Sequence, residues 1–303
     1  MKNIIIATLI VIVLGAGAYF YFRTPVPAPV TSVTPTQTET TVTPPAPIVE
    51  TKPQVDKTKT VIGASVSGNN ITAHHYGEGT TELLFVGGIH GGYEWNTVLV
   101  AYELMDYLKA NPSVIPKNIK VTVIPVLNPD GLKKVVGTTE RFSAKDVAAS
   151  EATVISGRFN ANTVDLNRNF DCDWKSKGVW QTKSVSGGSA AFSEPESQAI
   201  KKYVETAKPT AVVVWYSAAG GVFASNCHGG VSKETTAIMK KFAAASTYPA
   251  YESFDFYATT GDMVNWLAKN SIPAISVILT NHTDTEWSKN KAGVEALLKY
   301  YTK

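Results

Sequence analysis

Cysteine and charge are both scarce in this sequence, and each shortage excludes a class of protein. Only 2 of the 303 residues are cysteines, too few for a disulfide-rich scaffold or a four-cysteine zinc site. Charged residues make up 17% of the chain, and the formal net charge is +3. Nucleic-acid binding usually needs a concentrated basic face, so a nucleic-acid partner is not expected. With 44% apolar residues, the chain can nevertheless bury a sizeable core.

Residues 1–23 are predicted to form a membrane anchor or a signal peptide. An uncharged apolar run extends from residue 4 to residue 22. As a helix it would span about 28 Å, close to the thickness of a bilayer core. It is either a single-pass transmembrane helix at the cell membrane or a signal peptide cleaved near residues 16–18, which would leave the protein secreted. Both alternatives place the rest of the chain outside the cytoplasm.

Residues 24–59 are predicted to form a disordered linker. They hold 8 of the 16 prolines, interleaved with threonine and valine. Proline fixes φ and lacks a backbone donor, so neither a helix nor a sheet can propagate through such a segment. The folded part is therefore expected at residues 60–303.

Residues 60–303 alternate between buried apolar runs and helical patterns. Strands are predicted at 82–87, 119–127, 211–216 and 274–279, and helices at 96–108, 195–206, 233–245, 262–269 and 289–301. This alternation predicts an α/β domain with a mixed, largely parallel central sheet flanked by helices. Ser193 and Glu196 are predicted to form a capping box at the start of the second helix.

Two groups of polar residues follow predicted strands or loops, where α/β proteins place their sites. His90 and Glu94 come directly after the first strand, and an imidazole beside a carboxylate can hold a divalent metal. Alternatively, they cap a turn and start a helix. Asn167 and Arg168 form an amide beside a guanidinium, which suits capture of a carboxylate. The alternative is a solvated loop.

Together these motifs resemble the M14 family of zinc carboxypeptidases. The resemblance covers essentially all of residues 60–303, and its motifs occur in the family's order. They are Gly-Gly-Ile-His90, Asn-Pro-Asp130-Gly, Val-Asp165-Leu-Asn167-Arg168-Asn-Phe, Phe192-Ser193-Glu194-Pro-Glu196, and Tyr257 nine residues before Trp266. The family hydrolyses C-terminal residues from peptides, so the resemblance implies one zinc ion and peptide or protein C-termini as partners.

The resemblance also assigns roles to residues of this sequence. It implies His90 and Glu94 as metal ligands, Arg158 at the developing oxyanion, Asn167 and Arg168 at the terminal carboxylate, Tyr257 closing over the substrate, and Val264 at the base of the specificity pocket. An apolar residue at that base favours apolar C-terminal side chains.

Three positions depart from the family pattern. His90 and Glu94 are separated by one residue more than in the family. Tyr216 stands where the family has its third metal ligand, a histidine, and a phenol is a poor ligand until it loses its proton. Ile278 stands where the family has its general base, whose loss commonly costs about 10²–10⁴ in rate.

Other residues offer possible substitutes. His228, His282, Glu286 and Asp262 lie near these positions in the sequence, each with the alternative of being a loop or cap residue. Cys172 and Cys227 are expected near the pocket rim, as a disulfide or as two buried thiols.

Two functions are therefore open. The first is a membrane-tethered, extracytoplasmic zinc metallocarboxypeptidase, with cell-wall peptides as one candidate substrate class. The second is a catalytically impaired domain of the same fold that binds peptide C-termini without cleaving them.

Overall fold

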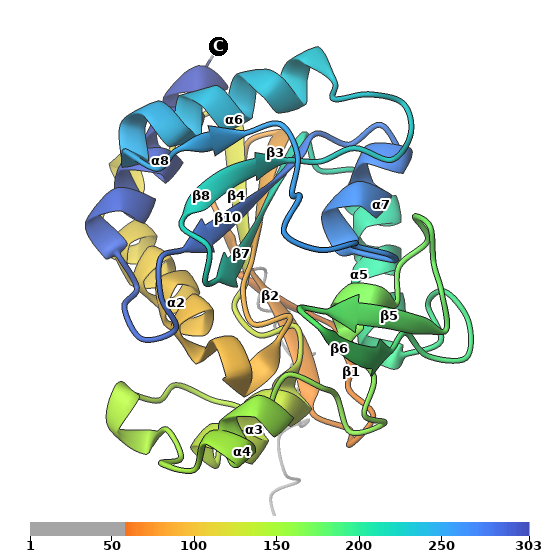
Figure 1. Ribbon diagram of the computed structural model, residues 1–303. Coiled ribbons are helices and arrows are strands. Elements are labelled where there is room, and N and C mark those ends of the chain that lie inside the picture. The colour runs from red at the N-terminus through yellow and green to blue at the C-terminus, as the bar shows by residue number, and fades with distance from the viewer. Residues whose placement is uncertain (1–57, 303) are drawn as a thin grey trace, which may run out of the picture. The chain divides into compact units, whose positions relative to one another are not determined.

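A mixed sheet of eight strands forms the centre of the computed structural model, which describes residues 58–302 (Figure 1). Its strands, in spatial order, are β1 (Lys59–Ala64), β2 (Asn70–Tyr76), β4 (Ile119–Ile124), β3 (Thr81–Val86), β7 (Ala211–Ser217), β10 (Ala274–Leu279), β8 (Gly221–Ala224) and β9 (Ala250–Tyr251). The central strands β4, β3, β7 and β10 are parallel, whereas β2 and β8 run antiparallel to their central neighbours. The predicted mixed, largely parallel sheet is confirmed.

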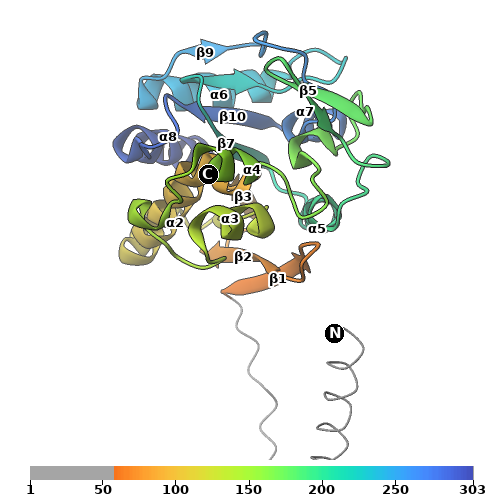
Figure 2. The ribbon, with the colours of Figure 1, turned by 60° about the horizontal axis from the view of Figure 1, so that its bottom comes forward.

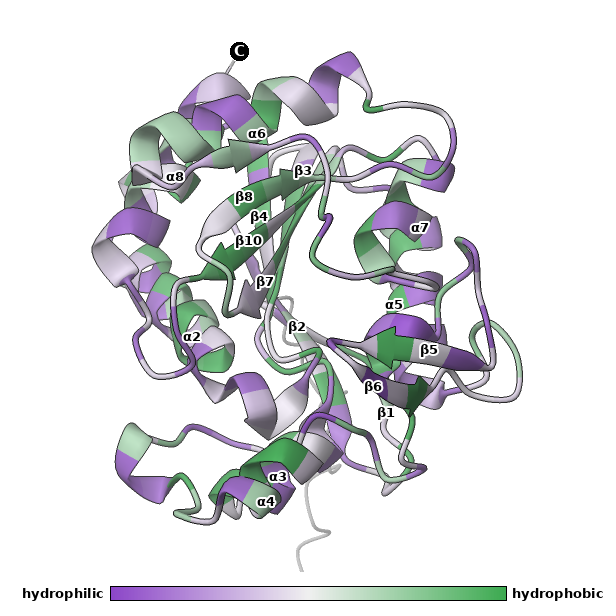
Figure 3. Ribbon diagram, in the orientation of Figure 1, coloured by the Kyte–Doolittle hydropathy of each residue, from purple (hydrophilic) through white to green (hydrophobic). Residues whose placement is uncertain are grey.

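Helices cover both faces of this sheet (Figure 1). They are α2 (Trp95–Ala110), α3 (Pro129–Val136), α4 (Glu151–Ser156), α5 (Pro195–Ala207), α6 (Lys233–Ser246), α7 (Met263–Lys269) and α8 (Trp287–Tyr300). Alternate residues of β3 point to opposite faces: Phe85 joins a core with α2, α6 and α8, and Leu84 joins a core with α5 and α7. Figure 3 shows the strands β3, β8 and β10 as predominantly hydrophobic, as burial on both faces requires.

The two edges of the sheet are short or irregular. β9 contains only two residues, and the register between β1 and β2 shifts between Val61 and Gly63. In Figure 2, β9 and β1 lie at opposite sides of the domain. A separate hairpin, β5 (Lys177–Trp180) with β6 (Lys183–Ser186), lies outside the main sheet.

The predicted capping box of Ser193 and Glu196 is wrong, although α5 begins at Pro195 as predicted. Glu194 is the residue that precedes α5, and its own side chain makes no capping hydrogen bond. The hydroxyl of Ser193 instead donates to Glu194 Oε1 at 2.8 Å. Two asparagine amides, from Asn160 and Asn162, both donate to Glu194 Oε2 at 2.8 Å. Glu196, the other residue of the predicted capping box, is also bound by distant groups. Its Oε2 accepts from Nδ2 of Asn160 and its Oε1 accepts from the backbone N–H of Val66, both at 3.2 Å.

The predictions for residues 1–57 lie outside the described residues, including the membrane anchor or signal peptide and nearly all of the linker. Within residues 58–302, every helix is too short or too polar to cross a bilayer.

Candidate functional site

A cavity of about 620 Å³ opens beside the carboxyl ends of β3, β7 and β10. All nine residues singled out by sequence for the site or as its departures line it: His90, Glu94, Arg158, Asn167, Arg168, Tyr216, Tyr257, Val264 and Ile278. Parallel strands end at one edge of a sheet, which is why segments far apart in the sequence meet here. The roles expected for these residues remain predictions, but their proximity is a property of the fold.

Glycines bring the chain sharply from β3 into the cavity. Gly88 has a φ of +62°, and a Cβ on it would lie 2.8 Å from a methyl group of Val98. A side chain is therefore excluded on both backbone and packing grounds. The turn leads to His90 and then to the 3-10 helix η1 (Gly91–Glu94), which continues directly into α2.

His90 and Glu94 lie against each other with uncommitted polar atoms. They are 4% and 2% exposed, and Nδ1 of His90 lies 2.9 Å from Oε1 of Glu94. Nε2 of His90 lies 3.5 Å from Asp165 Oδ1. Neither contact is aligned as a hydrogen bond, and Glu94 Oε2 likewise has no hydrogen-bond partner among residues 58–302. Buried atoms of this kind are suited to a ligand from outside the chain.

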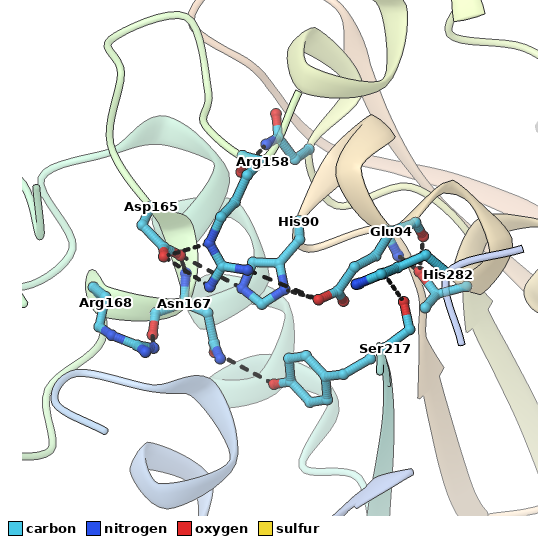
Figure 4. A network of polar contacts seen from close by, with 12 residues as sticks. His90, Glu94, Arg158, Asp165, Asn167, Arg168, Ser217 and His282 are labelled. Carbon is cyan, nitrogen blue, oxygen red and sulfur yellow. Dashed lines mark hydrogen bonds and ion pairs between the residues drawn. The ribbon is translucent and has the colours of Figure 1, made fainter. Parts of the chain in front are cut away.

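Arg158 is fixed by a buried ion pair. Its Nε and one terminal nitrogen each lie 2.9 Å from Oδ2 of Asp165, and its guanidinium lies 4.5 Å from the ring centre of Trp180. Burial opposes ionisation of Asp165, but the guanidinium outweighs it and holds the pKa of this carboxyl well below its usual range. The other terminal nitrogen lies 3.8 Å from Glu94 Oε1, so Arg158 faces the pair described above (Figure 4).

Arg168 is buried but keeps donors for a ligand. It follows Asn167 in the 3-10 helix η4 (Leu166–Arg168), and its Nε and one terminal nitrogen donate to the carbonyl of Val179 at 3.1 and 2.7 Å. The other terminal nitrogen donates to the carbonyl of Asn167 at 2.6 Å. A guanidinium has five N–H groups, so each terminal nitrogen retains one. The ring of Tyr257 lies 5.8 Å from this guanidinium.

Asn167 is oriented by two donors. Its Oδ1 accepts from the backbone N–H of Met263 at 3.0 Å and from the hydroxyl of Tyr216 at 3.3 Å. The amide oxygen is thereby occupied from both sides, which leaves the Nδ2 group to donate to a ligand. Two neighbouring residues, Asn167 and Arg168, thus present donors to one cavity, as the sequence predicts.

Tyr216 occupies the expected position of the third metal ligand without the chemistry of a ligand. Its ring centre lies 5.6 Å from that of His90, and its hydroxyl donates to Asn167. Burial, reinforced by the carboxylates of Asp262 and Glu94, raises the pKa of Tyr216 well above its usual value. The phenol therefore keeps its proton at neutral pH and acts as a hydrogen-bond donor.

Ile278 lies directly beside Tyr216, because the two residues are paired in the parallel register of β10 and β7. It is 7% exposed and lines the cavity. A hydrocarbon side chain cannot accept a proton, so the position expected for the general base is apolar.

Each of the possible substitutes already has a partner among residues 58–302, although His282 and Asp262 also line the cavity. Nδ1 of His282 lies 2.9 Å from the hydroxyl of Ser217, and His228 pairs with Asp173 on the surface. Glu286 holds the 280–289 segment, where it pairs with Lys289. Asp262 accepts from the backbone of Asn265 at the start of α7, the cap role considered as its alternative.

The residues present do not fit the family's zinc site. His90 and Glu94 supply two ligands, but the structure between residues 58 and 302 contains no cluster of three histidine, cysteine or acidic side chains placed to hold a metal. A catalytic zinc site has three protein ligands and leaves its fourth position open. Tyr216 is the residue that leaves the set incomplete.

Two residues that hold the site were not singled out by sequence. Asp165 belongs to the Val-Asp-Leu-Asn-Arg motif, but the family resemblance gives it no role. An acidic residue seven positions after Arg158 was the sequence signal for an Arg158–Asp165 ion pair. Trp180 packs against Arg158 from the hairpin β5–β6, and four-residue strands carry too little periodicity to place such a contact.

Cys172 and Cys227 form a disulfide, which decides between the two alternatives. It joins the loop after η4 to the loop after β8, where Asn226 lines the cavity. The bond spans a sequence separation of 55 residues. Such a cross-link restricts the unfolded chain and is commonly worth about 2–4 kcal/mol.

Replacement of both cysteines by alanine is therefore expected to lower the free energy of unfolding by about 2–4 kcal/mol. Urea unfolding of the oxidised protein with and without reductant measures the loss. The double-alanine variant is the control, since reductant should leave its midpoint unchanged. An unaltered midpoint of the natural chain after complete reduction would contradict the prediction.

Comparison with known proteins places the chain among peptidases. The family model described as zinc carboxypeptidase, Peptidase_M14, matches residues 48–285. Carboxypeptidase Z of Rattus norvegicus is 30% identical over 179 residues, covering 50% of this chain and 25% of the relative. The catalytic chain of carboxypeptidase N of Homo sapiens is 25% identical over 211 residues, covering 64% of this chain and 40% of the relative. The chain thus matches less than half the length of either protein.

Solved structures show the same fold. Murein-tripeptide amidase MpaA from Escherichia coli O157 superposes with a TM-score of 0.55 at 20% identity, covering 81% of this chain and 93% of that one. Carboxypeptidase A from Helicoverpa armigera superposes with a TM-score of 0.59 at 18% identity, covering 80% and 66%.

Proposed function

Because the chain belongs to the zinc carboxypeptidase family, Peptidase_M14, we propose that it binds peptides by their terminal carboxylate and does not hydrolyse them through that family's zinc chemistry. The observation that carries this proposal is Tyr216, a protonated phenol in place of the third metal ligand. Ile278 beside it supports the same conclusion, because a proton acceptor is missing from that position as well.

The carboxylate clamp is the part of the family's site that this chain keeps. Arg168 retains one N–H on each terminal nitrogen, and Asn167 retains its Nδ2 group. A planar carboxylate can accept from both residues, and charge-assisted bonds of this type are about twice as strong as neutral ones. Val264 and Ile278 supply apolar wall for the side chain of the bound residue.

Cell-wall peptides are the first ligand class to test. The solved neighbour from Escherichia coli O157 is named a murein-tripeptide amidase, and its fold covers most of this chain. The proposal also places the domain outside the cytoplasm, held by the apolar run at residues 4–22 or secreted after its cleavage. Protease accessibility in intact cells would test this placement.

Hydrolysis is the second candidate function, favoured by the uncommitted atoms of His90 and Glu94. The two functions differ in the metal content of the protein. Two ligands hold zinc weakly, so elemental analysis of the purified chain is expected to find well under one zinc per chain after dialysis against micromolar zinc. One tightly held zinc per chain, lost to a chelator and regained on re-addition, would instead favour hydrolysis.

A further inference from the structure

Glu94 carries an oxygen that nothing in the described part of the chain satisfies. The side chain is 2% exposed, and Oε2 has no hydrogen-bond partner there. Its other oxygen, Oε1, already faces His90 at 2.9 Å and Arg158 at 3.8 Å. A carboxylate has room for about four donors, and burying one without them costs free energy. Glu94 therefore lines the cavity and carries a buried acceptor that is unpaired among residues 58–302.

In the rest of the family this acceptor would belong to the metal site. Among residues 58–302, no third ligand joins His90 and Glu94, and the hydroxyl of Tyr216 donates a hydrogen bond to Oδ1 of Asn167. The carboxyl group of Glu94 remains in the cavity when the metal site is lost. A donor carrying positive charge is the partner that best compensates it.

Two arginines line the same cavity, and they differ in their acceptors. The charge of Arg158 is balanced by Asp165, in contact at 2.9 Å. Among residues 58–302, Arg168 donates hydrogen bonds only to the backbone carbonyls of Asn167 and Val179. The carboxylates of Asp165 and Asp262 interact with it electrostatically but accept no hydrogen bond from it. Arg168 therefore has no side-chain acceptor among residues 58–302, and Glu94 Oε2 has no donor there.

Both groups line one cavity of about 620 Å³, a size typical of small-molecule sites. A ligand held by both must carry a carboxylate and an ammonium group that fit together inside this cavity. An interior residue of a long peptide offers no ammonium group, only amide N–H and carbonyl groups. Glu94 and Arg168 together therefore favour a ligand whose free amino terminus lies inside the cavity.

We propose that Glu94 binds the free ammonium group of a ligand whose carboxylate is bound by Arg168, so that the domain selects a zwitterionic amino acid or dipeptide over the end of a longer chain. The inference rests on the carboxylate clamp of the proposed function and names the ligand class of that same site.

The test compares ligands that differ only in the ammonium group. Calorimetric titrations of the full chain, purified in mild detergent, use glycyl-L-phenylalanine and its N-acetyl derivative, and then L-phenylalanine and N-acetyl-L-phenylalanine. A chelator is present throughout, because a free amine can also bind trace metal. A hydrogen bond to a charged group is worth about 1.5–3 kcal/mol, so one free-amine ligand is expected to bind about ten- to a hundredfold more tightly than its acetylated partner.

Two variants assign that preference to Glu94. Glu94→Gln keeps the shape of the side chain and removes its charge, so the preference should fall to about unity. Glu94→Asp keeps the charge and should retain a preference. Thermal unfolding of each variant verifies that it is folded, and the Asp variant keeps the test valid if the Gln variant is not.

The outcomes separate this inference from the proposed function. Equal binding of both acetylated and free ligands would overturn the ammonium site and leave the carboxylate clamp standing. A preference that survives in Glu94→Gln would also overturn it. Failure of every carboxylate ligand to bind would overturn the proposed function itself.

Discussion

Replacing Tyr216 with histidine and Ile278 with glutamate is expected to turn the domain into a zinc-dependent hydrolase of C-terminal residues. The ring of Tyr216 already lies 5.6 Å from that of His90, so an imidazole at this position would stand beside the two retained ligands. Position 278 is its neighbour in the parallel register, so a glutamate there would supply the missing base at the same edge of the sheet. The largest gain is expected from the two changes together.

The two substitutions should contribute different properties. Tyr216→His alone is expected to bind about one zinc per chain but to turn over slowly, because a general base is worth about 10²–10⁴ in rate. Ile278→Glu alone should remain without zinc and without activity. Release of phenylalanine from a blocked dipeptide measures the rate, and elemental analysis measures the metal.

Tyr216→Phe is the matched control. It keeps the aromatic ring and removes the hydroxyl that donates to Asn167, so it should gain neither zinc nor activity. Addition of chelator should abolish the activity of the double variant. If the natural chain hydrolysed the same peptide as fast as the double variant, the loss of the active site would be refuted.

Arg168→Ala is expected to weaken binding of carboxylate ligands by about a hundredfold or more. The two free N–H groups of Arg168 form the charged part of the clamp, and charge-assisted hydrogen bonds contribute about 1.5–3 kcal/mol each. Metal content should not change, because Arg168 contacts neither His90 nor Glu94. Calorimetric titration of the variant with glycyl-L-phenylalanine measures the loss.

Arg168→Lys separates charge from geometry. A lysine keeps the positive charge but cannot present two parallel donors, so an intermediate affinity is expected. The alanine variant also removes the hydrogen bonds to Val179, and its thermal unfolding must be compared with that of the natural chain. Undiminished ligand affinity in a folded Arg168→Ala variant would show that the carboxylate binds elsewhere.

The central strands and the long helices could be predicted, because buried elements show a periodic pattern of apolar residues in the sequence. The strand expected at 274–279 agrees with β10, and the helix at 195–206 ends one residue before α5 does. The short strands β8 and β9 could not be found, because two to four residues show too little periodicity. The predicted capping box of Ser193 and Glu196 does not form, because Glu196 instead accepts from Asn160 and Val66, which are distant in sequence.

The site could be located but not completed from sequence. His90, Asn167 and Arg168 follow strands or loops that end at one edge, so their convergence in one cavity follows from topology. The bond between Tyr216 and Asn167 joins residues 49 apart in sequence, and no local pattern encodes it. The same holds for the unpaired oxygen of Glu94, which depends on every neighbour that surrounds it.

The short and irregular edge strands of the central sheet limit how copies of this protein can associate. A long, regular edge strand is a template on which a second chain can add a strand, the first step of many aggregation processes. Here β9 offers only two residues, and the register shift in β1 interrupts the opposite edge. Many copies crowded together should therefore remain separate at the backbone level, and any assembly would have to be built from side-chain contacts.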